Sequence, residues 1–429
     1  MQLITERLKT YLHINQMDSD IQHFAVSYFK VDLIRNFSLG MVSTFLVLYF
    51  LDIVTIKALG ILIAIRFLIQ TIFDYPTGSL GDIIGQRNVL IIAFVGHIIS
   101  IIIFLFSTAF QHLLAGIIIQ AISNSQESGA LLSWFDNNYR GSKSELESRL
   151  YSQFMGKMQV LTYVITGTAI ILGGLIATSS SRFFLLVAYL FLLVSNLMII
   201  LRTINGHETI RDQSQPSYLH QFTLGIRFFL KEKGILYYYV GVAFLTAAGS
   251  GIWYELMLFP YYQSYSGSDF MTGMLRSTVF LLSAFLSYLG VRLINKIKNL
   301  RKSLFIHYLL ANPIWFSIIL IYTQIFPPEF SFVLSKFLGI ILIHLYVTIS
   351  ITVYTVLDKR LQLEIIPGEI RNSMYSITPT LFAILGIIFA FFGGLILGSY
   401  GFAWGLSLVI FLSIIGMILI GVGLRLFTI

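Results

Sequence analysis

The stretch PTGSLGDIIGQRNVL, residues 76–90, lies between two long apolar runs and decides how the rest of the chain is interpreted. It sets three glycines, one acid and one base at fixed intervals: Gly78, Gly81, Asp82, Gly85 and Arg87. Small residues permit a tight turn, and a carboxylate in that turn can face the positively polarised N-terminus of a neighbouring helix. The stretch is therefore predicted to be a short loop between membrane helices. The alternative is an ordinary solvated turn.

The composition indicates that the solvent of this chain is lipid. Of the 429 residues, 56% are hydrophobic and 11% are charged, and such an apolar composition is typical of membrane proteins. The chain has no cysteine, which excludes a disulfide framework and thiolate metal sites. We expect no metal and no cofactor. The 28 basic residues exceed the 20 acidic ones, but we interpret this excess through membrane topology and expect no nucleic-acid partner.

Apolar runs along the chain have the length that a helix needs to cross the hydrocarbon, which is roughly 20 residues. About twelve such runs are present, at 24–51, 54–77, 88–109, 113–136, 151–177, 182–202, 235–262, 270–291, 304–323, 331–357, 374–397 and 402–424. They are continuous rather than alternating, which excludes membrane strands. The sequence therefore predicts an all-α membrane protein with twelve transmembrane helices.

A long polar connection after the sixth run divides the chain into four regions. Residues 1–23 are a cytoplasmic N-terminal segment, either an interfacial helix or a frayed terminus, and show no cleavable signal peptide. Residues 24–202 form a first six-helix bundle, 203–234 a cytoplasmic linker and 235–429 a second bundle. The halves share a pattern, because Asp136, Glu147 and Arg149 recur with the same spacing at Asp358, Glu369 and Arg371. We therefore expect two pseudo-symmetric bundles.

Basic residues predict the orientation of the helices. If the N-terminus is cytoplasmic, the outer segments hold Lys57, Arg182 and Lys336, and most other basic residues fall in inner segments. This asymmetry is the positive-inside pattern. It predicts a multi-pass protein of the plasma membrane with both termini in the cytoplasm.

The opening stretch resembles the loop between helices 2 and 3 of the major facilitator superfamily of transporters, whose pattern is roughly G-x-x-x-D-x-x-G-R-[KR]. Gly78, Asp82, Gly85 and Arg87 match it, while Gln86 stands at the family's first basic position. Three further runs resemble bacterial and archaeal drug-efflux members: FDYPTGSLGD at 73–82, ESGALLSWFD at 127–136 and RLQLEIIPGEIRNSMYS at 360–376. The resemblance implies two six-helix bundles, alternating access and proton antiport.

Two positions depart from the pattern of proton-coupled drug exporters. Span four of those exporters usually carries an arginine ahead of a Gln-Gly pair, whereas here Gly116 or Ile117 precedes Gln120. Span five of the antiporters often has Gly-Pro ahead of Gly-Gly, whereas here Ile171 and Leu172 precede Gly173. Both departures bear on the antiporter subtype and leave the predicted fold unchanged.

Polar residues inside the predicted spans are the candidates for function, because a charge in the bilayer is costly unless it faces a polar interior or a partner. The candidate proton-coupling and substrate-cavity residues are Asp32, Arg35, Asn36, Arg66, Gln70, Asn124, Glu127, Trp253, Glu255 and Arg276. The first half has three deep acids, Asp32, Asp74 and Glu127, against two cations, so one surplus carboxylate is expected to carry a proton. The alternative is a structural network with two ion pairs and one neutral acid.

Residues near the predicted cytoplasmic ends are candidates for a gate that opens and closes the inner side. They are Asp74, Gly78, Gly81, Asp82, Gly85, Arg87, Asp136, Asp358 and Arg371. We expect Arg87 to pair with Asp136, and Asp82 to face the start of span eleven. The deep histidines, His97 and His344, are expected to be hydrogen-bonded core residues rather than proton carriers.

The residues favour a secondary active transporter that works by alternating access and exports an amphipathic or drug-like small molecule in exchange for protons. One alternative is an uptake symporter or a lipid or organic-anion transporter of the same fold. An alternative from another class is a non-transporting membrane receptor or sensor. An enzyme is not expected, because the chain has no paired-histidine zinc motif, no G-x-S-x-G elbow and no phosphate-binding glycine loop. The expected partners are a small-molecule substrate, protons and membrane lipid, and the expected state is a monomer.

Overall fold

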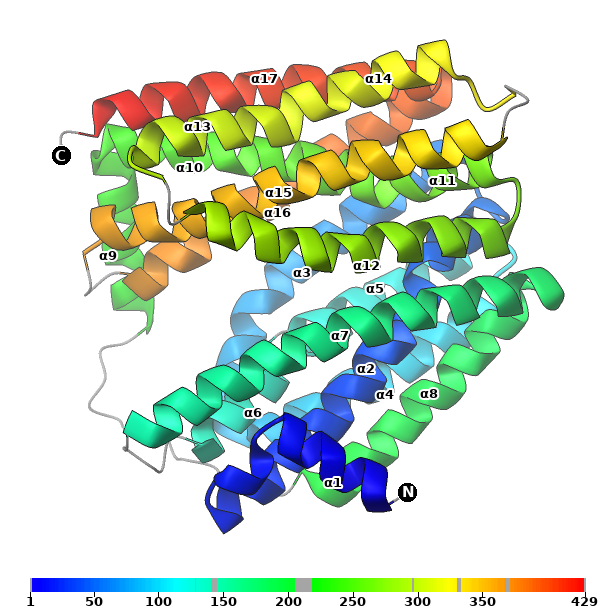
Figure 1. Cartoon of the computed structure of the whole chain (residues 1–429). Helices are drawn as coiled ribbons and strands as arrows, with labels where there is room; N and C mark the ends of the chain where they lie inside the picture. Colours follow the sequence, from blue (N-terminus) through cyan, green and yellow to red (C-terminus); the bar gives the residue numbers. More distant parts are fainter. Residues whose placement is uncertain are drawn as a thin grey trace. The chain divides into compact units, whose positions relative to one another are not determined.

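The structure is a computed structural model of the chain (Figure 1). It describes residues 2–127, 129–139, 145–204, 218–294, 297–329, 333–367 and 371–427. Within these ranges the regular elements are helices, which confirms the predicted all-α fold. In lipid the backbone N–H and C=O groups have no water to bind, and a helix satisfies them within one segment.

Eleven helices in the described part of the chain are long and apolar enough to cross a membrane, close to the twelve predicted. The remaining predicted span, 113–136, is divided between α5 (Phe110–Glu127) and α6 (Ala130–Tyr139). Gly129 precedes α6 with φ +80°, a left-handed conformation that residues with a Cβ rarely adopt. The fourth span is therefore helical on both sides of a glycine bend.

The chain forms two compact units. Unit 1 comprises Met1–Ile53, Ile69–Asp212 and Asp269–Ser277, and unit 2 comprises Val54–Leu68, Gln213–Ser268 and Thr278–Ile429. Two helices divide between them, because the first turns of α3 (Ile56–Ile84) belong to unit 2 and those of α12 (Asp269–Ile294) belong to unit 1. Each unit thus contains a short segment from the other half of the sequence.

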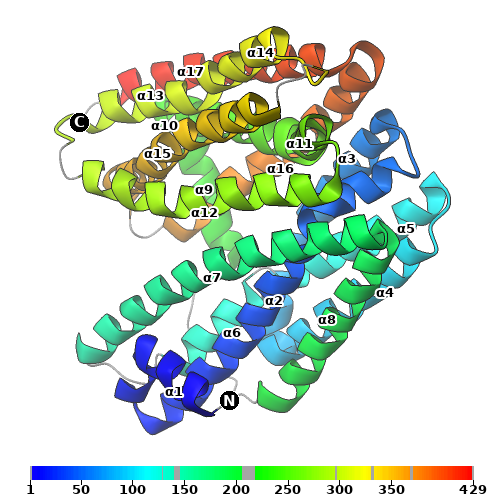
Figure 2. The ribbon, with the colours of Figure 1, turned by 45° about the vertical axis from the view of Figure 1, so that its right-hand side comes forward.

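Unit 1 is built around α2, which packs along α7 and α8, while α4 packs on α5 and α8 (Figure 2). The bounds of its helices not given above are α1 (Gln2–Tyr11), η1 (Ile14–Gln16), α2 (Ser19–Leu51), α4 (Gln86–Leu105), α7 (Glu145–Ser179) and α8 (Arg182–Thr203). Small residues bring α2 and α7 close together: a Cβ added at Gly173 would lie 2.0 Å from the carbonyl oxygen of Met41. Such close approach of helix backbones is the usual way that membrane helices associate.

Unit 2 is built around α10 and α17, which pack along each other. The bounds of its α-helices not given above are α9 (Tyr218–Lys231), α10 (Lys233–Thr246), α11 (Leu258–Ser266), α13 (Leu300–Leu309), α14 (Trp315–Ile325), α15 (Val333–Ile365), α16 (Arg371–Tyr400) and α17 (Phe402–Leu426). Two π-helical segments, η2 (Ala247–Met257) and η3 (Leu310–Ile314), interrupt the seventh and ninth spans. Gly241 packs on Gly416, where a Cβ would lie 2.7 Å from the Gly416 carbonyl oxygen.

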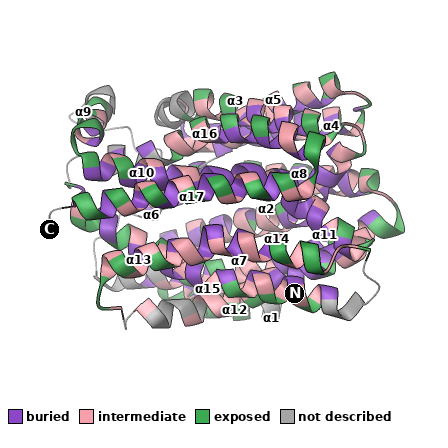
Figure 3. Ribbon diagram, turned by 90° about the horizontal axis from the view of Figure 1, so that it is seen from above, coloured by how far each residue is buried: buried purple, intermediate pink, exposed green. Residues whose placement is uncertain are grey.

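The outward faces of the helices are apolar. Buried and exposed positions are interspersed along the long helices (Figure 3). Large apolar side chains are among the most exposed: Phe191 is 69% exposed, Leu342 64% and Ile418 61%. In water such surfaces would drive association, whereas lipid solvates them. These faces agree with a multi-pass membrane protein.

The turn after the second span is shorter than the sequence predicts. Residues 76–84, expected to belong to a loop, continue α3 to Ile84, and α4 begins at Gln86. The reversal needs a single residue, Gly85, which has φ +86° and so adopts a conformation that glycine reaches without steric cost. The linker also contains a helix that was not predicted, α9, which buries Phe229 in the core of unit 2.

Candidate functional site

The predicted cavity residues lie in both units. Asp32, Arg35, Asn36, Gln70, Asn124, Glu127 and Arg276 belong to unit 1, and Arg66, Trp253 and Glu255 belong to unit 2. Some of these residues contact one another directly, in one ionic group of unit 1 and one of unit 2.

The ionic group of unit 1 has a buried carboxylate at its centre. Glu127, at the end of α5, is 8% exposed. Its Oε1 accepts a hydrogen bond from Arg35 Nε of α2, and its Oε2 lies 2.8 Å from Nε2 of His97 on α4. Three helices therefore contribute to one charge-assisted network, the strongest kind of hydrogen bonding available to a buried carboxylate. Sequence reasoning selected Arg35 and Glu127 but treated His97 as a core residue.

Asp32 lies one helical turn before Arg35, on the same face of α2. Arg35 and Glu127 both act electrostatically on its carboxyl group, and Asn36 donates a hydrogen bond to the Asp32 backbone carbonyl at 2.8 Å. With His97 neutral, the two carboxylates and one guanidinium carry one net negative charge. One proton bound to this group makes it neutral.

The ionic group of unit 2 joins Arg66 of α3 to Glu255 of the π-helical segment η2. Arg66 Nη2 lies 2.6 Å from Glu255 Oε1, and each side chain is 18% exposed. The Arg66 guanidinium also lies over the Phe67 ring, 5.4 Å from its centroid, within the range of a cation–π contact. This pair changes the charge count made from the sequence, because Arg66 is neutralised by Glu255 and not by an acid of the first half.

Trp253, two residues before Glu255, is the centre of a buried aromatic cluster in unit 2. Its ring centroid lies 5.7 Å from Trp315, 5.6 Å from Tyr261 and 6.3 Å from His344. Trp253 is 3% exposed, so it is a packed residue and not a member of an aromatic belt at the membrane interface. π-Helical segments are rare and often occur at functional sites, which makes η2 with Trp253 and Glu255 a candidate site.

The remaining cavity candidates take part less directly. The backbone carbonyl of Gln70 accepts a hydrogen bond from Ser125 Oγ at 3.4 Å, which joins α3 to α5. Asn124 and Arg276 are half-buried. None of these observations assigns the three side chains a role, so their place in the cavity stays a prediction.

The gate residues fall in part outside the described side chains, namely Gly78, Gly81, Asp82 and Arg371. The predicted ion pair between Arg87 and Asp136 is not present. Arg87 Nη2 instead donates to the Leu201 carbonyl at 3.4 Å, and Asp136 accepts from the Tyr151 hydroxyl at 2.6 Å. The carbonyls at the end of a helix carry partial negative charge, so the last turns of α8 offer Arg87 an alternative acceptor.

Two further acids of the predicted gate have different surroundings. Asp358, the counterpart of Asp136 in the second half, accepts hydrogen bonds from the Tyr238 hydroxyl and from Gln362 Nε2. Both repeated aspartates therefore accept a tyrosine hydroxyl, although from different helices. Asp74 is exposed near the middle of α3. The gating roles of these residues stay predictions.

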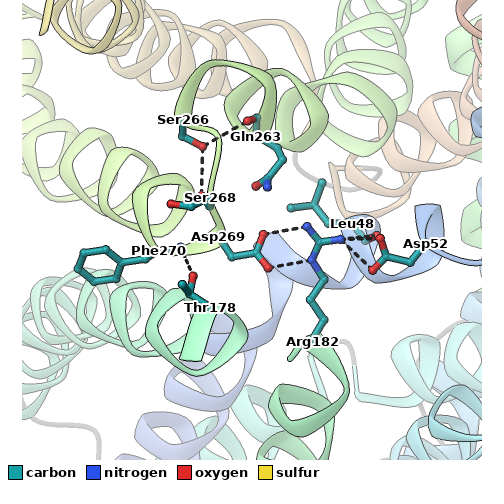
Figure 4. Close-up of polar contacts among 9 residues, drawn as sticks. All are labelled: Leu48, Asp52, Thr178, Arg182, Gln263, Ser266, Ser268, Asp269 and Phe270. Atoms are coloured by element: carbon teal, nitrogen blue, oxygen red, sulfur yellow. Dashed lines mark hydrogen bonds and ion pairs between the residues drawn. The ribbon is translucent and has the colours of Figure 1, made fainter. Parts of the chain in front are cut away.

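Sequence reasoning missed a third ionic group, which joins three helix ends of unit 1 (Figure 4). Arg182, the first residue of α8, donates from Nε and Nη2 to the two carboxylate oxygens of Asp269 at 2.9 and 2.8 Å. Its Nη1 donates to the Asp52 oxygens at 2.7 and 2.8 Å and to the Leu48 carbonyl at 3.2 Å. We call Arg182, Asp52 and Asp269 the Arg182 clamp.

Neighbouring contacts hold the start of α12 in the same place. Phe270 N–H donates to Thr178 Oγ1 at 2.7 Å, and Ser277 Oγ donates to the Gly167 carbonyl at 2.8 Å. A signal for the clamp was present in the sequence, since Asp52, Arg182 and Asp269 all stand at span ends on the predicted outer side. Arg182 had been used only to assign the orientation.

Comparison with known sequences identifies the family. A sequence model described as the Major Facilitator Superfamily matches residues 32–362. The chain belongs to the Major Facilitator Superfamily. The match covers most of the chain and includes the predicted loop, the Arg35–Glu127–His97 group and both π-helical segments.

Solved structures of other superfamily-type transporters have the same fold. A mutant of the nucleoside transporter NupG matches with a TM-score of 0.77 at 10% identity, over 94% of this chain and 100% of that chain. A bacterial homolog of the human lysosomal transporter Spinster, in an inward-facing and unoccupied conformation, matches with a TM-score of 0.70 at 11% identity, over 96% and 98%. A POT family transporter in complex with 5-aminolevulinic acid matches with a TM-score of 0.68 at 14% identity, over 92% and 94%.

At 10–14% identity these likenesses show the fold of a superfamily transporter and not a particular cargo. A comparison with curated protein sequences gave no match. Members of the superfamily are membrane transporters of small molecules and are generally not enzymes. A finer function for this member has to be argued from its own residues.

Proposed function

We propose that this chain is a secondary active transporter that works by alternating access and exports a small amphipathic molecule in exchange for protons. The observation that carries the proposal is the buried ionic group of Asp32, Arg35, His97 and Glu127 in unit 1. Ionisable residues inside a membrane are costly to keep and usually mark the path of an ion or substrate. Here they form one connected group whose net charge becomes zero when it takes up one proton.

The charge of this group also bears on the substrate. One surplus negative charge favours exchange between a proton and a cationic or polarisable amphipathic molecule, because either one neutralises the group. An anion would need an unpaired cation. Arg66, one of the arginines among the cavity candidates, is paired with Glu255 at 2.6 Å. The ion pairs therefore support a cationic substrate over the organic-anion alternative.

Alternating access needs contacts that can open at one side of the membrane. The start of α12 comes from the second half of the sequence and is held in unit 1 by the Arg182 clamp, by Thr178 and by Ser277. By the positive-inside pattern these contacts lie at the outer side, with both termini cytoplasmic. We propose that they form the outer gate of the transporter in the plasma membrane.

Transport by purified protein in proteoliposomes tests the proposal. A panel of cationic, neutral and anionic amphipathic compounds is presented with and without an imposed pH gradient. We expect a cationic compound to move against the direction of proton flow, and Glu127→Gln or Asp32→Asn to abolish the gradient-driven part. Glu329→Gln is the matched control, since Glu329 lies exposed in the turn after α14 and should keep the gradient response.

Other outcomes separate the alternatives. Movement of the compound in the same direction as the protons would indicate an uptake symporter. A response confined to anionic compounds would favour a lipid or organic-anion transporter. No movement of any compound under any gradient would contradict transport and favour a receptor or sensor.

A further inference from the structure

We propose that His97 is the residue that takes up the coupled proton, with Glu127 positioning it. The proposal rests on the proton-coupled transport argued above and assigns the proton to one atom of that group. His97 lies midway along α4 and is 6% exposed. Its Nε2 is 2.8 Å from Glu127 Oε2, and Glu127 is itself buried.

The second oxygen of Glu127 determines where the hydrogen atoms lie. Oε1 accepts from the guanidinium of Arg35, and this charge-assisted bond favours the ionised carboxylate. An ionised carboxylate only accepts hydrogen bonds, so Nε2 of His97 carries a hydrogen and donates it to Oε2. Nδ1 is then the acceptor nitrogen of the ring. A proton that arrives there makes the imidazolium and leaves both hydrogen bonds of Glu127 intact.

The charges around the ring favour that protonated state. The ionisable side chains on the helices packed against α4 are His112 and Glu127 of α5, Asp136 and Tyr139 of α6, and Arg182, Tyr189 and Arg202 of α8. From α2, Arg35 joins them through its hydrogen bond to Glu127, and Asp32 lies one turn from Arg35. Arg182 and Arg202 lie at opposite ends of α8, and Asp136 accepts a hydrogen bond from Tyr151. Tyr189 is buried and phenolic, and a tyrosine titrates far above physiological pH, at about 10. Asp32, Glu127 and Arg35 alone sum to minus one, so the imidazolium brings this group to zero; Asp136, which accepts a hydrogen bond from Tyr151, lies outside the group and is not part of the sum.

Protonating either carboxylate of this group weakens the compensation of the Arg35 guanidinium. Protonating Glu127 weakens its bond from Arg35 and leaves a guanidinium poorly compensated in a low-dielectric interior. Asp32 lies one turn from Arg35 and interacts with its guanidinium electrostatically, so protonating Asp32 removes part of the negative charge that compensates the guanidinium. Protonating His97 breaks neither of the two hydrogen bonds that Glu127 accepts. Histidine is also the side chain whose charge ordinarily changes between about pH 5 and pH 8.

The second deep histidine has different surroundings. His344 of α15 is also buried, but its Nδ1 lies 2.8 Å from the Ile340 carbonyl of its own helix, and its ring stacks on Trp253. The chain thus contains one deep histidine placed against a carboxylate and another placed among aromatic rings. Sequence position alone does not distinguish the two.

The first test measures the proton directly and does not depend on transport. Protein labelled with ¹⁵N-histidine in lipid nanodiscs is titrated by NMR, and His97→Gln assigns the resonance. We expect the His97 nitrogens to change from the neutral to the cationic pattern between about pH 5 and pH 8. Glu127→Gln should weaken the cationic pattern at a given pH, because the amide stabilises the cation less well than the carboxylate does. A ring that stays neutral down to pH 5 overturns the proposal.

The second test measures transport under an imposed pH gradient. His97→Gln keeps an N–H donor for Glu127 but binds no proton, so we expect the rate to become nearly independent of pH while substrate binding persists. His112→Gln, at an exposed histidine near the start of α5, is the control and should keep the wild-type pH profile. If His97→Gln responds to the gradient as the wild type does, the proposal fails and the proposed function stands. If the wild type itself ignores the gradient, both fail.

Discussion

Removing the Arg182 clamp should open the proposed outer gate by an amount that follows from the burial of its ion pairs. In Arg182→Gln the paired hydrogen bonds to Asp269 are lost where both partners are largely buried, with side chains 18% and 10% exposed. Breaking a fully buried pair costs about 3–5 kcal/mol, and partial exposure lowers the expected value to about 2 kcal/mol. The bond to Asp52 contributes less, because that side chain is 54% exposed and exposed pairs contribute about 0–1 kcal/mol.

A change of about 2 kcal/mol multiplies the population of the open state about thirty-fold, since 1.4 kcal/mol corresponds to tenfold. The chain has no cysteine, so Ser277→Cys supplies a single thiol in a natural background. Ser277 is 1% exposed and contacts the Gly167 carbonyl of α7, so its labelling reports separation of α12 from α7. A membrane-impermeant maleimide added from outside should label this thiol about thirty-fold faster when Arg182→Gln is also present.

Two controls make the prediction specific. Asp52→Asn removes the exposed partner and should raise labelling about fivefold at most, the equivalent of about 1 kcal/mol. Arg182→Gln combined with Asp269→Asn should label more slowly than Arg182→Gln alone, because the second change removes the uncompensated buried carboxylate that accounts for most of the cost. Equal labelling in wild type and Arg182→Gln would refute the reasoning, as would an effect of Asp52→Asn as large as that of Arg182→Gln.

Two further predictions concern stability in detergent. Arg66→Gln and Glu255→Gln should each lower the melting temperature, and the double variant should lose less than the sum of the two, because each single change strands a partly buried charge; additive losses would contradict the ion pair. Gly173→Ala should destabilise by about 1–3 kcal/mol, since its Cβ would lie 2.0 Å from the Met41 carbonyl oxygen. Gly156→Ala in the same helix meets nothing within 4 Å and should be neutral or slightly stabilising, so a similar loss at both glycines would show that packing is not the cause.

The sequence predicted some partners of the ionic groups and missed others, for identifiable reasons. Arg35 and Glu127 could be selected because a charge within an apolar run stands out by its solvation cost. Their direct contact could not, since the heights and rotations of α2 and α5 depend on packing. Arg66 was counted with the acids of the first half, yet its partner Glu255 lies beyond the linker.

The same limit explains His97 and the Arg182 clamp. A histidine on an apolar helix is usually a core residue, and the exception appears only when α4 packs on α5 and places Glu127 beside the ring. Asp52, Arg182 and Asp269 stood at three separate span ends, and nothing local indicated that one guanidinium would bind both acids. The expected pairing of Arg87 with Asp136 failed because each found another acceptor or donor nearby.

The amino-acid sequence alone determined that this protein is a helical membrane protein of two related halves, because each span's length and apolarity follow from the thickness of the bilayer and are local properties of the chain. The motif at 76–90 was enough to indicate the superfamily. Only the tertiary structure decided which charges meet, since hydrogen-bond partners are set to a fraction of an ångström by helix packing between residues as far apart as Arg182 and Asp269. Small residues such as Gly173 control that packing through contacts with other helices.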